Sequence, residues 1–118
     1  MSRRILVVDD NKDAADTLSM LLSLSGHEVH LAYTAREAFD LAERVRPEFG
    51  VLDISLPDWS GYELAQRIRR EAWGEQMRLI AVTGWGQADD KRLARAAGFD
   101  HHLTKPIDAT ELEQLFNA

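Results

Sequence analysis

The stretch ILVVDDN, residues 5–11, joins four consecutive apolar residues to two adjacent carboxylates. The run from Ile5 to Val8 predicts a strand that is covered on both faces, as in a parallel sheet. Asp9 and Asp10 then lie at the carboxyl end of that strand. Two neighbouring negative charges repel, so they are solvated and idle, cap the next helix, or bind a cation. The rest of the chain has to distinguish between these roles.

The composition is that of one folded domain. The chain has 118 residues, of which 45% are hydrophobic and 29% charged, and no low-complexity tract or repeat. A net charge of -6 argues against a nucleic-acid-binding face, which needs clustered Lys and Arg. Without cysteine there is no disulfide, thiolate nucleophile or Cys-ligated metal. The first apolar run is too short for a signal peptide or membrane span, so we expect a cytoplasmic protein.

Apolar runs alternate with amphipathic stretches five times along the chain, which predicts a parallel sheet with helices on both faces. The expected strands are 5–8 and those in HEVHLAY (27–33), FGVLDI (49–54), LIAVTG (79–84) and DHHLTKP (100–106). The expected helices are 11–25, 35–47, 61–72, 90–97 and 109–116. The fold class is therefore α/β, a (βα)5 flavodoxin-like fold with strand order 2-1-3-4-5.

The polar residues that could take part in chemistry follow directly after the strands. The first strand ends in Asp9 and Asp10, the third in Asp53, the fourth in Thr83 and the fifth in Lys105. In such sheets ligands bind beyond the carboxyl ends of the strands where the strand order reverses, here between strands one and three. Three carboxylates in one crevice are costly unless a hard cation neutralises them, and Mg²⁺ (or Mn²⁺) is the usual solution.

A carboxylate beside that cation can act as a nucleophile on a phosphoryl group and form an aspartyl phosphate. Lys105 supplies a positive charge and Thr83 a hydroxyl that can donate to a phosphoryl oxygen. Alone, Asp10 is a helix cap, Thr83 a β-former and Lys105 a solvated charge. Only their combination at matching strand ends favours phosphoryl chemistry.

Other aromatic and histidine residues carry weaker signals. His27 and His30 fit no ligand spacing with an acidic partner, so we interpret them as surface or strand residues. Trp59 and Trp85 lie near the expected site, and we expect both to be partly exposed.

Over essentially its whole length the chain resembles a receiver domain of the two-component response regulators. The resemblance is carried by VVDDN (7–11), LDISLPDWSG (52–61), AVTG (81–84) and LTKP (103–106). It implies that Asp53 is the phosphoacceptor, that Asp9 and Asp10 bind the metal with the backbone carbonyl of Ser55, that Thr83 is the switch hydroxyl and that Lys105 contacts the phosphate. In the family the Lys-Pro bond is commonly cis, so the bond between Lys105 and Pro106 is a candidate cis peptide.

Three departures from the family pattern stand out. Trp59 takes the place of a frequent Met, and His102 takes the place of the switch aromatic, commonly Tyr or Phe. Because His titrates near neutral pH, His102 leads to the hypothesis that the switch is pH-dependent. Ser55 and Trp85 lie two residues beyond Asp53 and Thr83, at positions that tune loss of the phosphoryl group, and a bulky Trp85 predicts a long-lived phosphoryl group.

The resemblance implies a signalling module rather than an enzyme, one that assists its own phosphorylation and dephosphorylation. Its partner would be a sensor histidine kinase or a histidine phosphotransfer protein, docked at Ala14, Ala15, Leu18 and Pro106. The surface that switches would comprise the helix at 90–97, the fifth strand and the helix at 109–116. A homodimer could form through the same surface. We expect a single receiver domain over residues 1–118 without an output domain, and a stand-alone regulator, a phosphorelay shuttle and an excised domain all remain open.

Three other functions use part of the same sequence pattern. A Mg²⁺-dependent phosphatase of the haloacid dehalogenase kind also uses an aspartate nucleophile, but its D-x-D signature is missing because the chain reads Asp9-Asp10-Asn11. A flavin-binding module would need Gly, Ser or Thr amides after the first strand, where the chain is acidic. A scaffold that has lost the chemistry is excluded because no catalytic residue type is missing.

Overall fold

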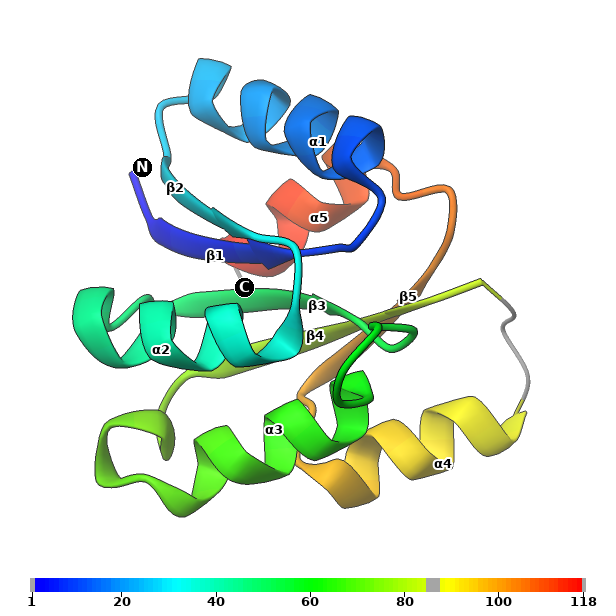
Figure 1. The fold of residues 1–118 in the computed structure, drawn as a ribbon. Coiled ribbons are helices and arrows are strands. Elements are labelled where there is room, and N and C mark those ends of the chain that lie inside the picture. Colours follow the sequence, from blue (N-terminus) through cyan, green and yellow to red (C-terminus); the bar gives the residue numbers. More distant parts are fainter. Residues whose placement is uncertain (1, 85–87, 118) are drawn as a thin grey trace.

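The parallel sheet and its strand order are as predicted. The computed structural model describes residues 2–84 and 88–117, and in it five parallel strands pair in the order β2-β1-β3-β4-β5 (Figure 1). The strands are β1 (Arg4–Val8), β2 (Glu28–Ala32), β3 (Phe49–Asp53), β4 (Arg78–Thr83) and β5 (His101–Thr104). The helices are α1 (Lys12–Leu24), α2 (Ala35–Val45), α3 (Gly61–Arg70), α4 (Ala88–Ala97) and α5 (Ala109–Phe116), with a short 3₁₀ helix η1 (Ala72–Gly74) that the sequence did not predict.

The two faces of the sheet carry separate cores because successive strand residues point to opposite sides. In β1, Ile5 and Val7 pack with α1 and α5, through Leu18, Leu22, Leu112 and Phe116 among others. Leu6 and Val8 pack on the opposite face with α2, α3 and α4. Figure 1 shows α1 and α5 above the sheet and the other three helices below it. All four of these β1 residues are at most 1% exposed, as a doubly covered strand requires.

Helix α1 begins one residue later than the sequence predicted, because Asn11 is its cap. The Asn11 side-chain oxygen accepts a hydrogen bond from the backbone N–H of Ala14 at 3.1 Å. Asp10 therefore does not cap the helix and stays exposed. This removes the simplest alternative role of Asp10.

The interpretation of His27 as a surface residue is wrong. Its side chain is only 2% exposed, its Nε2 lies 2.8 Å from a carboxylate oxygen of Glu113 in α5, and its Nδ1 accepts from the backbone N–H of Arg3. His30 lies in β2 as expected, although it too has an acidic partner, Glu28, at 2.7 Å. Burial of His27 follows from its place under α5, which no local pattern indicates.

Arg69 ties several elements together at one corner of the molecule. Its guanidinium donates to the carbonyl of Gly98 at 3.0 Å, to the carbonyls of Gly74 and Met77, and to the carboxylate of Asp100 at 2.9 Å. Asp100 in turn accepts from the backbone N–H of Leu79 at 2.8 Å. The end of α3, η1, the start of β4 and the turn between α4 and β5 are thus held by one side chain.

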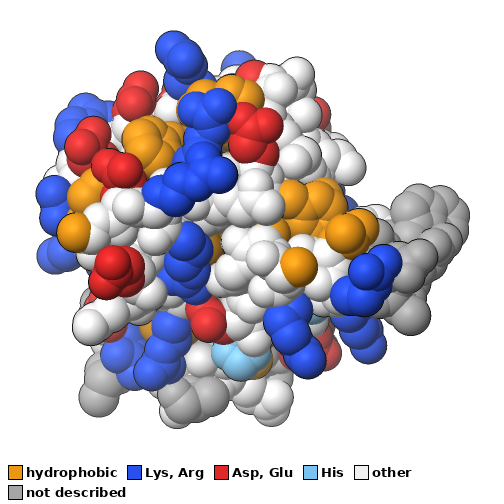
Figure 2. Space-filling view, turned by 90° about the horizontal axis from the view of Figure 1, so that it is seen from below, with side chains coloured by type: hydrophobic (Ala, Val, Ile, Leu, Met, Phe, Trp, Pro, Cys, Tyr) orange, Lys and Arg blue, Asp and Glu red, His pale blue; other side chains and the backbone are white. Residues whose placement is uncertain are grey.

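Charged side chains are scattered over the face of the molecule that α2, α3 and α4 cover. Figure 2 views the molecule from this side and shows Lys and Arg side chains, with Asp, Glu and hydrophobic side chains between them. Among the helices of residues 2–84 and 88–117, none combines the length and the apolar character that crossing a membrane requires.

Candidate functional site

Three carboxylates meet where β1 and β3 end side by side. The two strands pair in parallel with Val8 opposite Leu52, so the residues that follow them, Asp9 and Asp53, leave the sheet at the same edge. One carboxylate oxygen from each of Asp9, Asp10 and Asp53 lies within 4.8 Å of the others. Asp9 and Asp53 are buried whereas Asp10 is exposed, so the cluster is open to solvent on one side.

Backbone hydrogen bonds fix the two buried carboxylates. The N–H of Asn11 donates to Oδ1 of Asp9 at 3.0 Å, and the N–H of Ser55 donates to Oδ1 of Asp53 at 3.1 Å. The N–H of Asp9 itself donates to the carbonyl of Ala32 at the end of β2. Among the residues that the structure describes, no backbone N–H donates to the Oδ2 of Asp9 or of Asp53.

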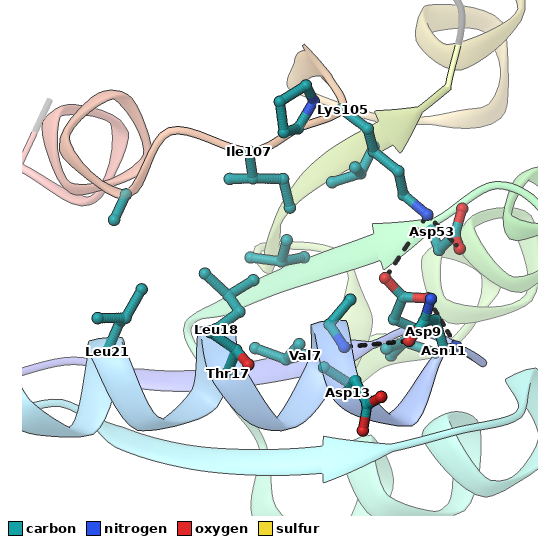
Figure 3. A pocket seen from close by; sticks show the side chains of 17 residues that line it. Val7, Asp9, Asn11, Asp13, Thr17, Leu18, Leu21, Asp53, Lys105 and Ile107 are labelled. Carbon is teal, nitrogen blue, oxygen red and sulfur yellow. Dashed lines mark hydrogen bonds and ion pairs between the residues drawn. The ribbon is translucent and has the colours of Figure 1, made fainter.

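Lys105 is the cation of this site. Its Nζ donates to Oδ2 of Asp53 at 3.0 Å and lies 3.6 Å from Oδ2 of Asp9 (Figure 3). The peptide bond that joins Lys105 to Pro106 is cis, where the resemblance implied it. The N–H of Lys105 donates to the carbonyl of Thr83, which holds the segment after β5 against the end of β4.

Burial and charge act in opposite directions on Asp53. Burial raises the pKa of Asp53, the hydrogen bonds from Lys105 and from the Ser55 N–H lower it, and the negative charge of Asp9 raises it again. The pKa of Asp53 remains above its ordinary value, so a single ammonium does not fully compensate the buried charge. Burial alone would lower the pKa of Lys105, but the hydrogen bond and charge of Asp53, with Asp9, raise it.

The donor set fits a hard divalent cation. Oxygen ligands from one or two carboxylates, completed by waters, are the coordination that Mg²⁺ prefers. Three carboxylates against one lysine leave the cluster with excess negative charge, and the pKa of Asp53 is raised by burial first and by the charge of Asp9 in addition. Asp9, Asp10 and Asp53 can therefore hold such an ion.

Thr83 and His102 face each other at the ends of β4 and β5. Oγ1 of Thr83 lies 3.1 Å from Nε2 of His102, and Thr83 is 5% exposed. The hydroxyl is therefore in contact with β5, and it follows Val82, the residue of β4 that pairs with Asp53. Trp85, whose expected exposure and shielding role concern this same region, lies outside the described residues.

A groove extends from the acidic cluster along α1. Its volume is about 660 Å³, and its walls are α1 and the segment that joins β5 to α5. Figure 3 shows Asp9, Asp53 and Lys105 at one end and the apolar side chains of Leu18, Leu21 and Ile107 further along. The sequence predicted the acidic end, but not the groove.

The loop between β3 and α3 is fastened to α2, which the sequence did not indicate. Asp58 accepts hydrogen bonds from the N–H groups of Ala35 and Arg36 at 2.9 and 2.8 Å, and so caps the helix from a distant segment. Its neighbour Trp59 is partly buried, as expected, with the guanidinium of Arg67 3.8 Å from its ring centroid. The loop that follows Asp53 is thereby held in place.

We expect Asp58→Asn to lower the free energy of unfolding by about 0.5 kcal/mol at neutral pH, because the amide offers one acceptor oxygen in place of two and carries no charge at the start of α2, and because solvent screens such a charge at an exposed site. Burial alone would raise the pKa of Asp58, but the N–H groups of Arg36 and Ala35 outweigh it and the pKa lies below its ordinary value. A lowered pKa stabilises the fold above the unfolded-state value of about 3.9, and this stabilisation is lost as the pH falls through the folded-state value.

Urea unfolding of both proteins between about pH 7 and about pH 3 measures this effect. The difference between wild type and Asp58→Asn should shrink toward the acid end of the series. A difference that is constant with pH would show that the carboxylate charge contributes nothing.

The family model of the response regulator receiver domain matches residues 5–117 of the chain. The chain belongs to this receiver domain family. An uncharacterised 14.6-kDa protein of Leptolyngbya boryana is 40% identical to this receiver domain over 111 residues, which are 94% of this chain and 85% of the relative.

Solved structures agree with the fold of this receiver domain. A CheY-like receiver domain protein of Methanospirillum hungatei JF-1 has a TM-score of 0.90 at 30% identity, with 99% of this chain and 92% of that chain covered. The receiver domain of the sensor histidine kinase PA1611 of Pseudomonas aeruginosa has a TM-score of 0.90 at 28% identity, with 99% and 96% covered. That structure is described with a magnesium ion coordinated in its active-site cleft.

Proposed function

We propose that this receiver domain is the phosphoacceptor of a two-component or phosphorelay system, with Asp53 as the residue that takes the phosphoryl group. The observation that carries the proposal is the buried Asp53 carboxylate with Lys105 at 3.0 Å and with Asp9 and Asp10 within 4.8 Å. Asp9 is also buried in this cluster, but its Oδ2 lies 3.6 Å from the Lys105 ammonium, whereas Asp53 accepts a hydrogen bond from that ammonium at 3.0 Å.

In the proposed reaction a carboxylate oxygen of Asp53 attacks the phosphorus of a phosphohistidine. The new O–P bond forms as the N–P bond breaks, and the electron pair of that bond returns to the imidazole nitrogen. The Lys105 ammonium, which is paired with Asp53 beforehand, would contact the phosphoryl oxygens afterwards. A bound Mg²⁺, held by Asp9, Asp10, Asp53 and the Ser55 carbonyl, would supply further positive charge for those oxygens.

The Thr83 hydroxyl is the proposed sensor of the phosphoryl group. In the structure it contacts Nε2 of His102 at 3.1 Å. A phosphoryl group on Asp53 offers strong acceptor oxygens to the same hydroxyl. If Thr83 turns toward them, His102 loses its partner, and the surface formed by α4, β5 and α5 changes with it.

Protonation of His102 should alter this exchange, because the imidazolium has two donors and no acceptor. We expect the phosphorylation-induced amide shifts of α4 and β5 to differ between about pH 6 and about pH 8, and the difference to disappear in His102→Phe. Two-dimensional NMR of the phosphorylated proteins measures this. Identical shifts at both values in the wild type would refute the coupling.

The groove along α1 is the proposed docking site of the phosphohistidine donor. Ala14, Ala15, Leu18 and Pro106 all line it, and it leads directly to Asp53. A histidine side chain presented by a sensor histidine kinase or a histidine phosphotransfer protein could therefore approach Asp53 along an apolar wall.

The test of the function is the intact mass of the protein after incubation with a small acyl-phosphate donor. With Mg²⁺ present we expect a gain of one phosphoryl group, and with EDTA none, because the carboxylates then repel the donor. Tryptophan fluorescence in the same samples reports any accompanying change near Trp59. If Mg²⁺ gives no adduct with the small donor or with a phosphohistidine protein, the proposal is wrong.

A further inference from the structure

A second hollow lies at the opposite edge of the sheet from the acidic cluster, where the strands begin. Its volume is about 290 Å³, and its lining includes Arg3, Arg46, Phe49, Trp73 and Arg78. These residues come from the segment before β1, the end of α2, the start of β3, η1 and the start of β4, at the left of Figure 1. The length of β3 separates the hollow from Asp53 by roughly 13 Å.

Positive charge is concentrated in this hollow. Three arginines line it against one acid, Glu48, although the whole chain carries a net charge of -6. Glu48 is paired with Nη1 of Arg3 at 3.1 Å. The guanidinium of Arg46 instead lies over the ring of Trp73, 5.5 Å from its centroid. Its Nε donates to the carbonyl of Glu43, and no acid among the residues at 2–84 and 88–117 is paired with it.

Two buried donors in the lining have no acceptor. Nε of Arg3 and Nε1 of Trp73 are the buried side-chain donors without a hydrogen-bond partner in the part of the chain that the structure describes. Both belong to side chains that line the same hollow. Buried polar groups are nearly always paired, with protein, water or an ion, so two orphaned donors on side chains of one hollow call for an explanation.

We propose that this hollow binds a small oxyanion, a phosphate or a carboxylate group. Guanidinium groups bind both in a forked, charge-assisted geometry, and an indole N–H can only donate. A water molecule could accept from Trp73 or Arg3, but it would leave the charge of Arg46 uncompensated. An oxyanion would supply both acceptor oxygens and negative charge once the two donors, which are covered in this structure, turn toward the hollow, and it would bridge the end of α2 to the starts of β1 and η1.

The indole N–H of Trp73 gives a direct readout. We would record ¹⁵N-labelled wild type in Tris chloride with EDTA, so that no divalent cation links the titrated anion to the acidic cluster, and assign the indole signal with Trp73→Phe. Sodium phosphate and sodium acetate are titrated separately, with sodium chloride at equal ionic strength as the reference. We expect a saturable shift of the Trp73 signal with phosphate or acetate and none with chloride, and the more effective anion identifies the ligand class.

Arg46→Gln should weaken this binding about tenfold, the usual effect of losing one charge-assisted contact. Arg44→Gln is the matched control, because Arg44 is an exposed arginine of the same helix end that does not line the hollow. It should bind like the wild type. A Trp73 signal that responds to all three salts alike, or to none, in the wild type would overturn the proposal, and this outcome requires no variant to fold.

Discussion

Asp53→Asn is expected to take up no phosphoryl group from an acyl-phosphate donor in the presence of Mg²⁺, under conditions where the wild type is fully converted. The asparagine amide has nearly the size of the carboxylate and can still accept from the Ser55 N–H or from Lys105, but it is not a nucleophile. Intact-mass spectrometry measures the loss, which should reach the background.

The same variant should not be less stable than the wild type at neutral pH. Because the pKa of Asp53 is raised in the fold, the stabilising contribution of this residue is present below the unfolded-state value of about 3.9 and is lost as the pH rises through the folded-state value. At neutral pH the ionised carboxylate therefore costs stability, and a neutral amide removes that cost. Thermal unfolding at about pH 7 should give a midpoint equal to or above that of the wild type.

Asp40→Asn serves as the control, since Asp40 is an exposed acid on α2 outside the acidic cluster. It should incorporate one phosphoryl group at the wild-type rate. Full uptake by Asp53→Asn would place the phosphoacceptor elsewhere in the chain and contradict the proposed function.

Gly61→Ala should destabilise the protein by about 1–3 kcal/mol and slow phosphorylation. A Cβ at Gly61 would lie 2.5 Å from the carbonyl oxygen of Asp53 and 2.7 Å from Cα of Ile54, and both of these are backbone atoms that cannot turn away. The N–H of Gly61 also donates to the carbonyl of Ile54 at 2.8 Å. Any relief of the clash therefore moves the strand end that carries the phosphoacceptor.

Urea unfolding and the rate of mass gain measure the two effects of Gly61→Ala. Gly84→Ala is the stability control, because a Cβ at Gly84 meets no atom of residues 2–84 and 88–117 within 4 Å. Its free energy of unfolding should stay within about 0.5 kcal/mol of the wild-type value. Equal stability of the two variants would mean that the close approach at Gly61 imposes no constraint.

Local pattern in the sequence was sufficient to predict the sheet and the location of the acids. The run Ile5 to Val8 alternates between two buried faces, and an uninterrupted apolar run is what such a strand requires. The parallel arrangement then places every strand end at one edge, so Asp9 and Asp53 had to be neighbours. The meeting of Asp9, Asp10 and Asp53 follows from these two facts.

Contacts between distant segments could not be predicted from the sequence. Periodicity reports whether a residue faces its own core, but not which side chain comes to meet it. Burial of His27 depends on Glu113, 86 positions away, and the role of Asp58 depends on the start of α2. The hollow beside Trp73 is formed by four separate stretches, at residue 3, residues 46–49, residue 73 and residues 76–78, none of which has a distinctive sequence.

The corner held by Arg69 determines how α4 can move. Its guanidinium binds Gly98 and Asp100, just after the end of α4, and so ties them to the end of α3, while Asp100 also binds the start of β4. The carboxyl end of α4 is therefore held in place, and any tilt of the helix would turn about this end. The helix has ten residues and is about 15 Å long. A small tilt started beside Thr83 and His102 would be least at Ala97 and largest at Ala88, so a partner that reads the amino end of α4 would receive the amplified movement.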